Sequence, residues 1–221
     1  MKADASVPFD PFSLLSDAQC EQLDAYAEQL RRFNPKINLI SPDTGPHIRE
    51  RHLLHSLALT WRRFPPASRI VDWGTGGGLP AIPLAIAFPE VDVFAVDSVG
   101  KKVRAVRAMA RRLGLDNLFA WNGRAEDWTG TAHYSVSRAT APLADLWRWH
   151  RRIVDPDVPS SGDDVWAPGL IGLKGGNLSA EIADLRAEDG GVVIEQHPLR
   201  PLLGRDYFAD KCIITVRSSD D

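Results

Sequence analysis

The sequence of 221 residues is short of the features that mark several protein classes. It has only two cysteines, Cys20 and Cys212, which form neither a disulfide framework nor a zinc cluster. Its longest apolar run, residues 79–88, contains ten residues and two prolines, whereas a membrane helix needs roughly 20 apolar residues. No apolar segment follows the N-terminus, so we expect no secretory signal, no membrane partner and a cytoplasmic location.

Net charge is also small, but it conceals an uneven distribution. The 26 Lys and Arg and the 29 Asp and Glu give a net charge of −3, which alone argues against a nucleic-acid partner. Residues 31–112, however, carry 14 basic and 6 acidic side chains, leaving 12 basic and 23 acidic ones elsewhere. Such segregation can steer an anionic partner if the basic residues share a face, and the alternative is ordinary solvated surface charge.

Hydrophobic periodicity divides the chain into two parts. Ser16 and Gln19 form a capping-box signature that predicts a helix over 17–33, ended by the Asn34–Pro35 step. A second helix is expected over 46–63, beginning at Pro46, so residues 1–64 form a helical extension. Short β-prone runs then predict strands at 69–73, 91–96, 117–121, 133–138, 169–173, 191–196 and 211–217. Helices are expected between them at 79–88, 100–113, 141–153 and 178–188.

The alternation of strands and helices predicts parallel βαβ units. We therefore expect one α/β domain over residues 65–221, built on a single open sheet of seven strands. Residues 155–168 hold three prolines and four aspartates, and this composition predicts an exposed connection without a functional role.

The first predicted strand leads directly into a glycine-rich turn, Gly74-Thr75-Gly76-Gly77-Gly78-Leu79-Pro80. Glycines let a ligand approach the backbone, and the free N–H groups at the start of the next helix favour a polar or anionic group. Four glycines in five residues exceed the needs of a bare turn and favour a ligand site. A dinucleotide fingerprint would need glycine where Leu79 stands, and a phosphate loop would need Gly-Lys-Ser/Thr, so both are disfavoured.

Two further polar features follow the next two predicted strands. Asp97 ends the second strand, where a carboxylate can accept hydrogen bonds from ribose hydroxyls. The third strand is followed by Asn122-Gly123-Arg124-Ala125-Glu126-Asp127, at the same edge of the sheet. An aspartate at a strand end is common by itself. Combined with the glycine loop and the acidic turn, it indicates a site for S-adenosylmethionine.

Seven segments of the chain form a specific pattern when they are taken together. They are FNPKINLIS (33–41), RERHLLHSLAL (49–59), VDWGTGGGLPAIPLAI (71–86), VDSVGKKVR (96–104), NGRAED (122–127), VSRATAPL (136–143) and LKGG (173–176). From about residue 16 to the C-terminus, the chain resembles the small-subunit (16S) ribosomal RNA guanine-N7 methyltransferases, also called glucose-inhibited division protein B. It departs from that family at His55, where aspartate is usual, and at Ala81, where the family's PGIP has glycine.

The resemblance implies a class I methyltransferase sheet, which is Rossmann-like and mostly parallel, with the last of its seven strands antiparallel. It also implies methyl transfer from S-adenosylmethionine to guanine N7 in the decoding region of 16S rRNA, and a link to streptomycin susceptibility. By motif position and the glycine-loop argument, the cofactor-binding residues would be Gly74, Gly76, Gly78, Leu79, Asp97, Ser98, Ala125, Glu126 and Arg138. The resemblance assigns catalytic roles to Arg138, Lys101 and Arg124, and contact with the rRNA to Lys101, Arg124, Arg138 and Lys174.

The predicted helix 100–113 supplies a candidate RNA surface. Residues 101–112 contain six cations and no acid. An apolar stripe is expected at Val103, Val106, Ala110 and Leu113, which leaves Lys101, Lys102, Arg104, Arg107 and Arg111 available for phosphate. The alternative is a solvated helix face.

Histidines and tryptophans have plainer interpretations. His52 and His55 share a helix face, but no third metal ligand accompanies them, so we expect no metal and interpret His52 as a contact to RNA. The tryptophans at Trp61, Trp73, Trp147 and Trp149 are expected in the core.

Guanine N7 already holds a free lone pair, so this chemistry needs no general base and depends on alignment. The absence of an Asn/Asp-Pro-Pro-Tyr/Phe motif and of a candidate catalytic cysteine agrees with that expectation. We expect a monomer that acts on small-subunit rRNA or a ribosomal particle. Two alternatives remain at this point: a small-molecule methyltransferase on the same scaffold, and a non-catalytic ribosome-assembly factor that binds RNA.

Overall fold

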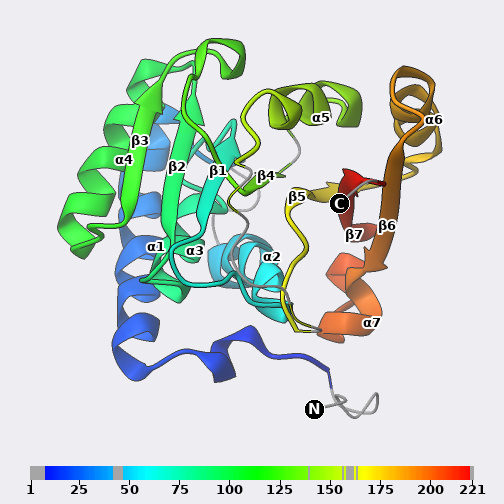
Figure 1. Cartoon of the computed structure of the whole chain (residues 1–221). Helices are drawn as coiled ribbons and strands as arrows, with labels where there is room; N and C mark the ends of the chain where they lie inside the picture. The colour runs from blue at the N-terminus through cyan, green and yellow to red at the C-terminus, as the bar shows by residue number, and fades with distance from the viewer. Residues whose placement is uncertain are drawn as a thin grey trace.

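The computed structural model describes residues 8–41, 47–138, 140–155, 157, 162 and 164–219. Its centre is one open sheet with the strand order β3-β2-β1-β4-β5-β7-β6 (Figure 1). The strands are β1 (Arg69–Trp73), β2 (Asp92–Asp97), β3 (Leu118–Asn122), β4 (Tyr134–Arg138), β5 (Gly169–Gly175), β6 (Val192–Pro198) and β7 (Lys211–Ser218). The first five strands pair in parallel, whereas β7 runs antiparallel to both β5 and β6. The predicted seven-stranded, mostly parallel sheet is therefore confirmed, as is the antiparallel last strand.

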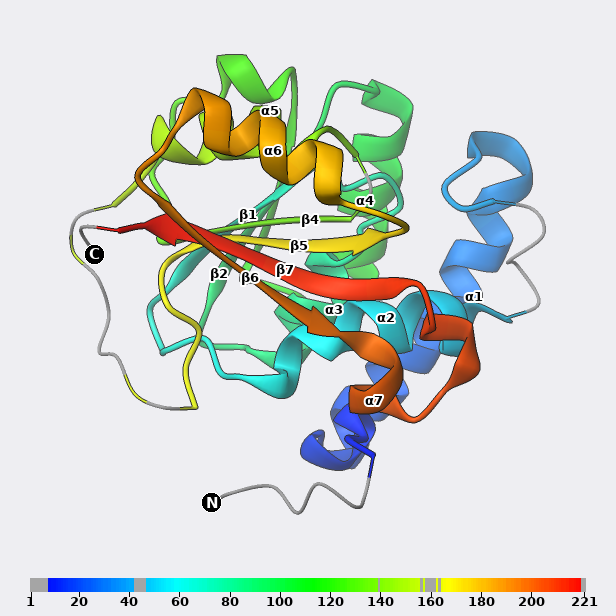
Figure 2. The same ribbon diagram turned by 90° about the vertical axis from the view of Figure 1, so that its right-hand side faces the viewer.

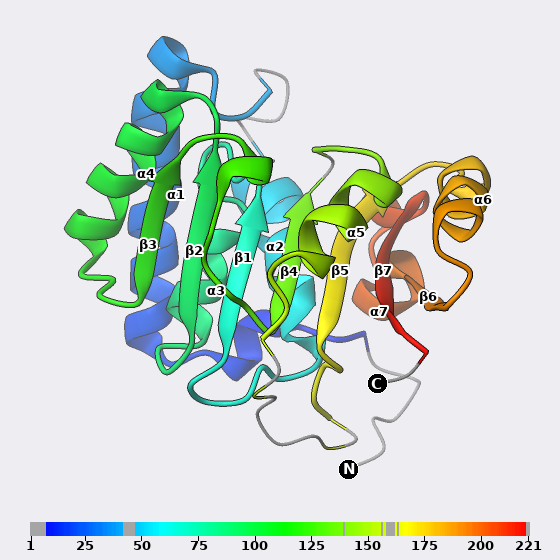
Figure 3. The same cartoon turned by 45° about the horizontal axis from the view of Figure 1, so that its top comes forward.

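Helices cover both faces of the sheet, as Figures 2 and 3 show. The helices are α1 (Asp17–Ile37), α2 (Leu54–Leu57), α3 (Ala81–Ala87), α4 (Gly100–Leu113), α5 (Leu143–Arg151), α6 (Ser179–Glu188) and α7 (Leu199–Leu203). Short 3₁₀ turns occur at Pro11–Leu14, Ala58–Trp61, Ala125–Asp127 and Asp206–Phe208, and a π-helical turn at Arg49–Leu53. In Figure 2, α5 and α6 lie on one face of the sheet, while α1, α2 and α3 lie on the other.

The strand period of two divides the apolar residues between two cores. Ile70 on β1 packs with the helices α1 to α4, whereas its neighbours Val71 and Trp73 pack under α5 and α6. Leu23 and Leu30 of α1 are fully buried in the first of these cores. The N-terminal helices therefore share a core with the sheet that follows them.

The first helix is longer than the sequence predicts. The capping box forms as expected, because Gln19 N–H donates to Ser16 Oγ and Ser16 N–H donates to Gln19 Oε1. The helix then continues through Pro35 to Ile37 and ends where Asn38 adopts a left-handed φ of 56°. Because Pro35 lies in the last turn, its missing N–H removes a single helical bond, which is too little to end the helix earlier.

Two other expectations are modified. The helix predicted over 46–63 is a run over 49–61 that passes from π to α to 3₁₀ geometry, and its predicted start at Pro46 lies outside the described residues. The connection 155–168 is not wholly exposed, since Trp166 is buried and its indole N–H donates to the Leu59 carbonyl at 2.8 Å. Among the described residues, no helix combines the length and the apolar character needed to cross a membrane.

Candidate functional site

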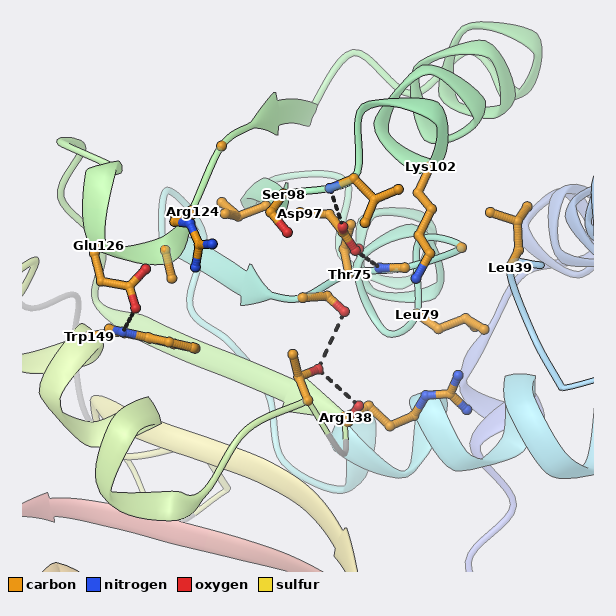
Figure 4. A pocket seen from close by; sticks show the side chains of 18 residues that line it. Leu39, Thr75, Leu79, Asp97, Ser98, Lys102, Arg124, Glu126, Arg138 and Trp149 are labelled. Carbon is orange, nitrogen blue, oxygen red and sulfur yellow. Dashed lines mark hydrogen bonds between the residues drawn. The ribbon is translucent and has the colours of Figure 1, made fainter. Parts of the chain in front are cut away.

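A cavity of about 490 Å³ opens at the carboxyl ends of the parallel strands (Figure 4). Its walls come from the glycine loop after β1, the end of β2, the turn after β3, the end of β4 and helix α5. Ligands of open α/β sheets bind at this edge of the sheet. Of the nine cofactor-binding residues that the sequence predicts, eight line this cavity: Gly74, Gly76, Leu79, Asp97, Ser98, Ala125, Glu126 and Arg138. The ninth, Gly78, does not line it.

Within the glycine loop, one glycine faces the cavity and another allows close packing. Gly76 has a φ of +57°, and a Cβ there would meet no atom closer than 3.9 Å, so this position presents bare backbone to open space. Gly78 has a φ of +92°, and a Cβ there would lie 2.6 Å from Ile82 of α3. Gly78 is therefore required for the close packing of the loop on the helix.

Asp97 connects the end of β2 to this loop. Its Oδ2 accepts the N–H of Gly76 at 2.9 Å, and its Oδ1 accepts the N–H of Val99 at 2.8 Å. A carboxylate offers about four lone-pair sites, so acceptor capacity remains on the side that faces the cavity. Asp97 can therefore order the loop and bind hydroxyl groups at the same time.

A second carboxyl lies behind the glycine loop. Asp72 on β1 is fully buried, and its Oδ2 accepts the N–H of Ala81 at the start of α3 at 3.2 Å. Burial raises the pKa of Asp72 to about 7, and the positive charge of Arg138 and the hydrogen bond from Ala81 only partly oppose this effect. Asp72 holds the loop and helix together and does not line the cavity.

Residues of the N-terminal segment also contact the glycine loop, Arg138 and the cavity. The hydroxyl of Tyr26 on α1 donates to the carbonyl of Gly77 in the glycine loop at 2.9 Å. His52, from the π-helical turn, contacts Arg138 with its Nδ1 atom 2.8 Å from Nη1. Leu39 lines the cavity directly. His52, which the sequence analysis interprets as a contact to RNA, is only 6% exposed and faces Arg138 in this structure.

Trp149 packs against the core as predicted, but only one part of it is buried there. It is partly exposed, lines the cavity, and donates its indole N–H to Glu126 Oε1 at 3.2 Å (Figure 4). Trp73 and Trp147 are buried as expected. The sequence gives little indication that Trp149 lines the cavity, because its position on α5 is compatible with a side chain that faces either the core or the cavity.

Helix α4 has the expected apolar stripe, with Val103, Val106, Ala110 and Leu113 all buried. Of the five predicted RNA contacts on α4, Lys101, Arg104, Arg107 and Arg111 are exposed, and Lys102 lines the cavity. Arg124 also lines the cavity, from the turn after β3. The guanidinium of Arg107 is not wholly free for phosphate, because its Nε and Nη2 donate to the Ala120 carbonyl at 3.0 and 2.7 Å.

Lys174, to which the resemblance assigns contact with the rRNA, is buried in this structure. Its side chain is 8% exposed, and its Nζ lies 2.6 Å from the Ala141 carbonyl and 2.7 Å from Glu181 Oε2. The same Glu181 oxygen also accepts the N–H of Leu143, at the start of α5. A buried ammonium requires a counter-charge, and this pairing joins β5, α5 and α6.

The described residues contain no group of three or more His, Cys, Asp or Glu side chains that could hold a metal ion. His55, the second histidine of the predicted pair, is buried with its ring 5.5 Å from that of Phe208. His52 and His55 therefore have separate partners and do not converge on one point.

Comparison with known proteins gives consistent relatives. The family model described as rRNA small subunit methyltransferase G (GidB) matches residues 19–158. The ribosomal RNA small subunit methyltransferase G of Salinibacter ruber is 61% identical over 215 residues, covering 96% of this chain and 99% of the relative. The protein of the same name from Parabacteroides distasonis is 36% identical over 219 residues, covering 96% and 91%.

Solved structures show the same fold at low sequence identity. Magnesium protoporphyrin IX methyltransferase from Synechocystis matches with a TM-score of 0.60 and 15% identity, over 92% of this chain and 98% of that one. A SAM-dependent methyltransferase from Aquifex aeolicus matches with a TM-score of 0.55 and 15% identity, over 94% and 97%.

Proposed function

The chain belongs to the rRNA small subunit methyltransferase G family, and we propose that it methylates N7 of a guanine in the decoding region of 16S rRNA. The methyl donor is S-adenosylmethionine. The observation that carries the proposal is the cavity at the carboxyl ends of the strands, which gathers eight of the predicted cofactor residues from four separate segments.

The cavity fits this cofactor in size and in chemistry. Its volume of about 490 Å³ lies within the range of roughly 300–1,000 Å³ that small-molecule sites occupy. Asp97 would accept the ribose hydroxyls, and the open backbone at Gly76 would allow the ligand to approach closely. Ala125 and Trp149 offer apolar surface to the adenine at one end of the cavity. The guanidinium of Arg138 offers charge to the carboxylate of the cofactor at the other end.

The acids of the site are engaged in binding. When bound, S-adenosylmethionine supplies an electrophilic methyl group, and guanine N7 needs no deprotonation to accept it. The Asp97 carboxylate accepts two backbone N–H groups, and Glu126 accepts the indole N–H of Trp149. These contacts suit groups that hold and orient ligands. They leave alignment as the main contribution of the chain to the rate.

The substrate must present its guanine outside a regular helix. In A-form RNA, N7 faces a deep and narrow major groove that side chains do not enter, so the target lies in a loop or is unstacked. Lys102 and Arg124 line the cavity, and helix α4, which carries Lys102, also carries exposed cations. We assign these cations to the phosphates around the target guanine. We propose that the chain acts as a monomer, and the rRNA substrate supports action in the cytoplasm.

Transfer of a tritiated methyl group tests the function. Undermethylated small-subunit particles, naked rRNA and a panel of small metabolites are offered in parallel, so that the rRNA and small-molecule alternatives give different results. N7-methylguanine carries a positive ring charge, and borohydride followed by aniline cleaves the strand at that nucleotide. We expect one such break in a non-helical stretch. Label on adenine, cytosine or ribose would refute the N7 assignment, and no label in any RNA would refute the function.

Titration calorimetry tests the cofactor site separately. Gly76→Val places a branched side chain where the ligand approaches, and we expect it to abolish measurable binding of S-adenosylmethionine. Gly190→Val is the matched control, since Gly190 is exposed and a Cβ there meets nothing within 4 Å. Equal affinity of both variants for the cofactor would show that the site is misplaced.

A further inference from the structure

Arg138 is a partly buried arginine that forms no ion pair with any of the described residues, so its charge is not neutralised. It ends β4 and lines the cavity, and burial lowers the pKa of its guanidinium. Its Nη1 atom is hydrogen-bonded to His52, which is not an acid. The carboxyl of Asp72 affects it only from a distance, and that group is itself buried with a pKa raised to about 7. The charge of Arg138 is therefore available to a ligand.

The contact between Arg138 and His52 fixes the proton on the imidazole. A guanidinium has five N–H donors and no acceptor, so in the 2.8 Å contact Nη1 must donate and His52 Nδ1 must accept. The proton of the neutral ring then lies on Nε2. Burial, together with the charges of Arg138 and Arg51, lowers the pKa of His52 to about 3, in agreement with a neutral ring.

We propose that His52 is a positioning residue that directs the Arg138 guanidinium toward the carboxylate of the cofactor without neutralising it. The inference rests on the function proposed above. An aspartate or glutamate at this position could accept the same hydrogen bond, but its negative charge would cancel the charge that attracts the ligand. A neutral acceptor fixes the direction of the guanidinium and leaves its full charge to bind an anion.

The arrangement of the cavity identifies which part of the cofactor Arg138 would meet. In Figure 4, Arg138 and Leu79 lie at one end of the cavity, and Glu126 and Trp149 lie at the other. Asp97, the ribose acceptor, lies between them. A cofactor with its adenine beside Trp149 therefore extends its amino-acid part toward Arg138. Because His52 belongs to the N-terminal helices, this segment contributes to cofactor binding as well as to the core.

Three substitutions at position 52 separate positioning from packing. His52→Asn keeps an acceptor near the place of Nδ1, His52→Leu removes it, and His52→Asp keeps it but adds a negative charge. His55→Asn is the matched control, since His55 is equally buried one turn away and packs on Phe208.

Two ligands make the readout specific for the carboxylate. S-adenosylhomocysteine carries the amino-acid part, whereas 5′-methylthioadenosine has the same adenosine and lacks it. By calorimetry we expect His52→Leu and His52→Asp to bind S-adenosylhomocysteine at least about 10-fold more weakly than the parent. The loss of one hydrogen bond to a charged group weakens binding by about this factor or more. We expect His52→Asn and His55→Asn to stay within about 3-fold of the parent, a change too small to mark the loss of a charged hydrogen bond. All four variants should bind 5′-methylthioadenosine like the parent.

The outcomes that overturn the proposal are distinct. Unchanged affinity of His52→Leu or His52→Asp for S-adenosylhomocysteine would exclude a positioning role. An equal loss for both ligands would show that His52 only supports the fold. If His52→Leu does not fold, the isosteric pair Asn and Asp still decides, because only the charge differs between them. Failure of the parent to bind S-adenosylhomocysteine would instead refute the proposed function.

Discussion

The buried carboxyl of Asp72 makes the stability of this chain depend on pH in a specific window. In the folded state burial raises its pKa to about 7, whereas an unfolded chain has a value of about 3.9. Between these values the folded state keeps a proton that the unfolded state releases. The free energy of unfolding must therefore decrease as the pH rises through the window and level off above the folded pKa. It is highest below the unfolded pKa.

The magnitude follows from the two pKa values. Each unit of pH within the window changes the free energy of unfolding by about 1.4 kcal/mol for one proton. From pH 5 to pH 8 the loss due to Asp72 is therefore about 3 kcal/mol, reached near pH 7. Asp72→Asn keeps an oxygen that can accept the N–H of Ala81 but carries no titrating proton. We expect the variant to lack this loss, so its stability relative to the parent should increase with pH.

Urea denaturation at pH 5, 6, 7 and 8 measures the effect, with both proteins followed by tryptophan fluorescence. Asp116→Asn, an exposed aspartate changed in the same way, controls for the general effect of removing a carboxylate. The difference between Asp72→Asn and the parent should grow by about 3 kcal/mol across the range, and that of the control should not. Parallel pH profiles for the parent and Asp72→Asn would refute the assignment of a raised pKa to this carboxyl.

Three further predictions concern other contacts of the fold and site. Tyr26→Phe leaves the carbonyl of the glycine loop without its donor, so urea denaturation should show a loss of about 1–3 kcal/mol, and calorimetry a weaker affinity for S-adenosylhomocysteine. Lys174→Met removes a buried ion pair, so it should lower the free energy of unfolding by about 1–3 kcal/mol. The salt dependence of RNA binding should stay unchanged. A flatter salt dependence would show that Lys174 contacts RNA. Filter binding over a salt series tests the α4 surface, where the slope should fall by roughly one unit for each phosphate-binding cation that is replaced by glutamate, at Arg104, Arg107 and Arg111.

The strands and the glycine loop could be predicted because their signals are local. Each strand is a short β-prone run with turn residues at its ends, and the structure moves the boundaries by no more than two residues. The glycine loop is contiguous, and its neighbours Asp97 and Glu126 follow strands whose carboxyl ends must meet at one edge of a parallel sheet. Topology therefore brings these residues together without any knowledge of how their side chains pack.

Lys174 and His52 are buried although the sequence analysis expected them to contact RNA, and the reason is that the sequence does not show the partner of a side chain. Lys174 follows a predicted strand just as Asp97 does, but its ammonium pairs with Glu181, on the helix that comes next. The sequence favours a contact with RNA for His52, yet its partner Arg138 lies 86 positions later. Periodicity gives the face of a helix but not the element that covers that face.

The N-terminal helices show how the unknown partners of side chains affect the prediction of the site. Composition separates residues 1–64 from the alternating strands and helices, and the natural interpretation is an appendage. In the fold, however, the Tyr26 hydroxyl donates a hydrogen bond to the glycine loop and His52 contacts Arg138. A class I sheet places Arg138 at the end of its fourth strand but supplies no neighbour to orient a long and flexible side chain. The N-terminal segment provides that neighbour, so the binding site is formed by both parts of the chain and removal of the segment would leave the strand-end arginine without its acceptor.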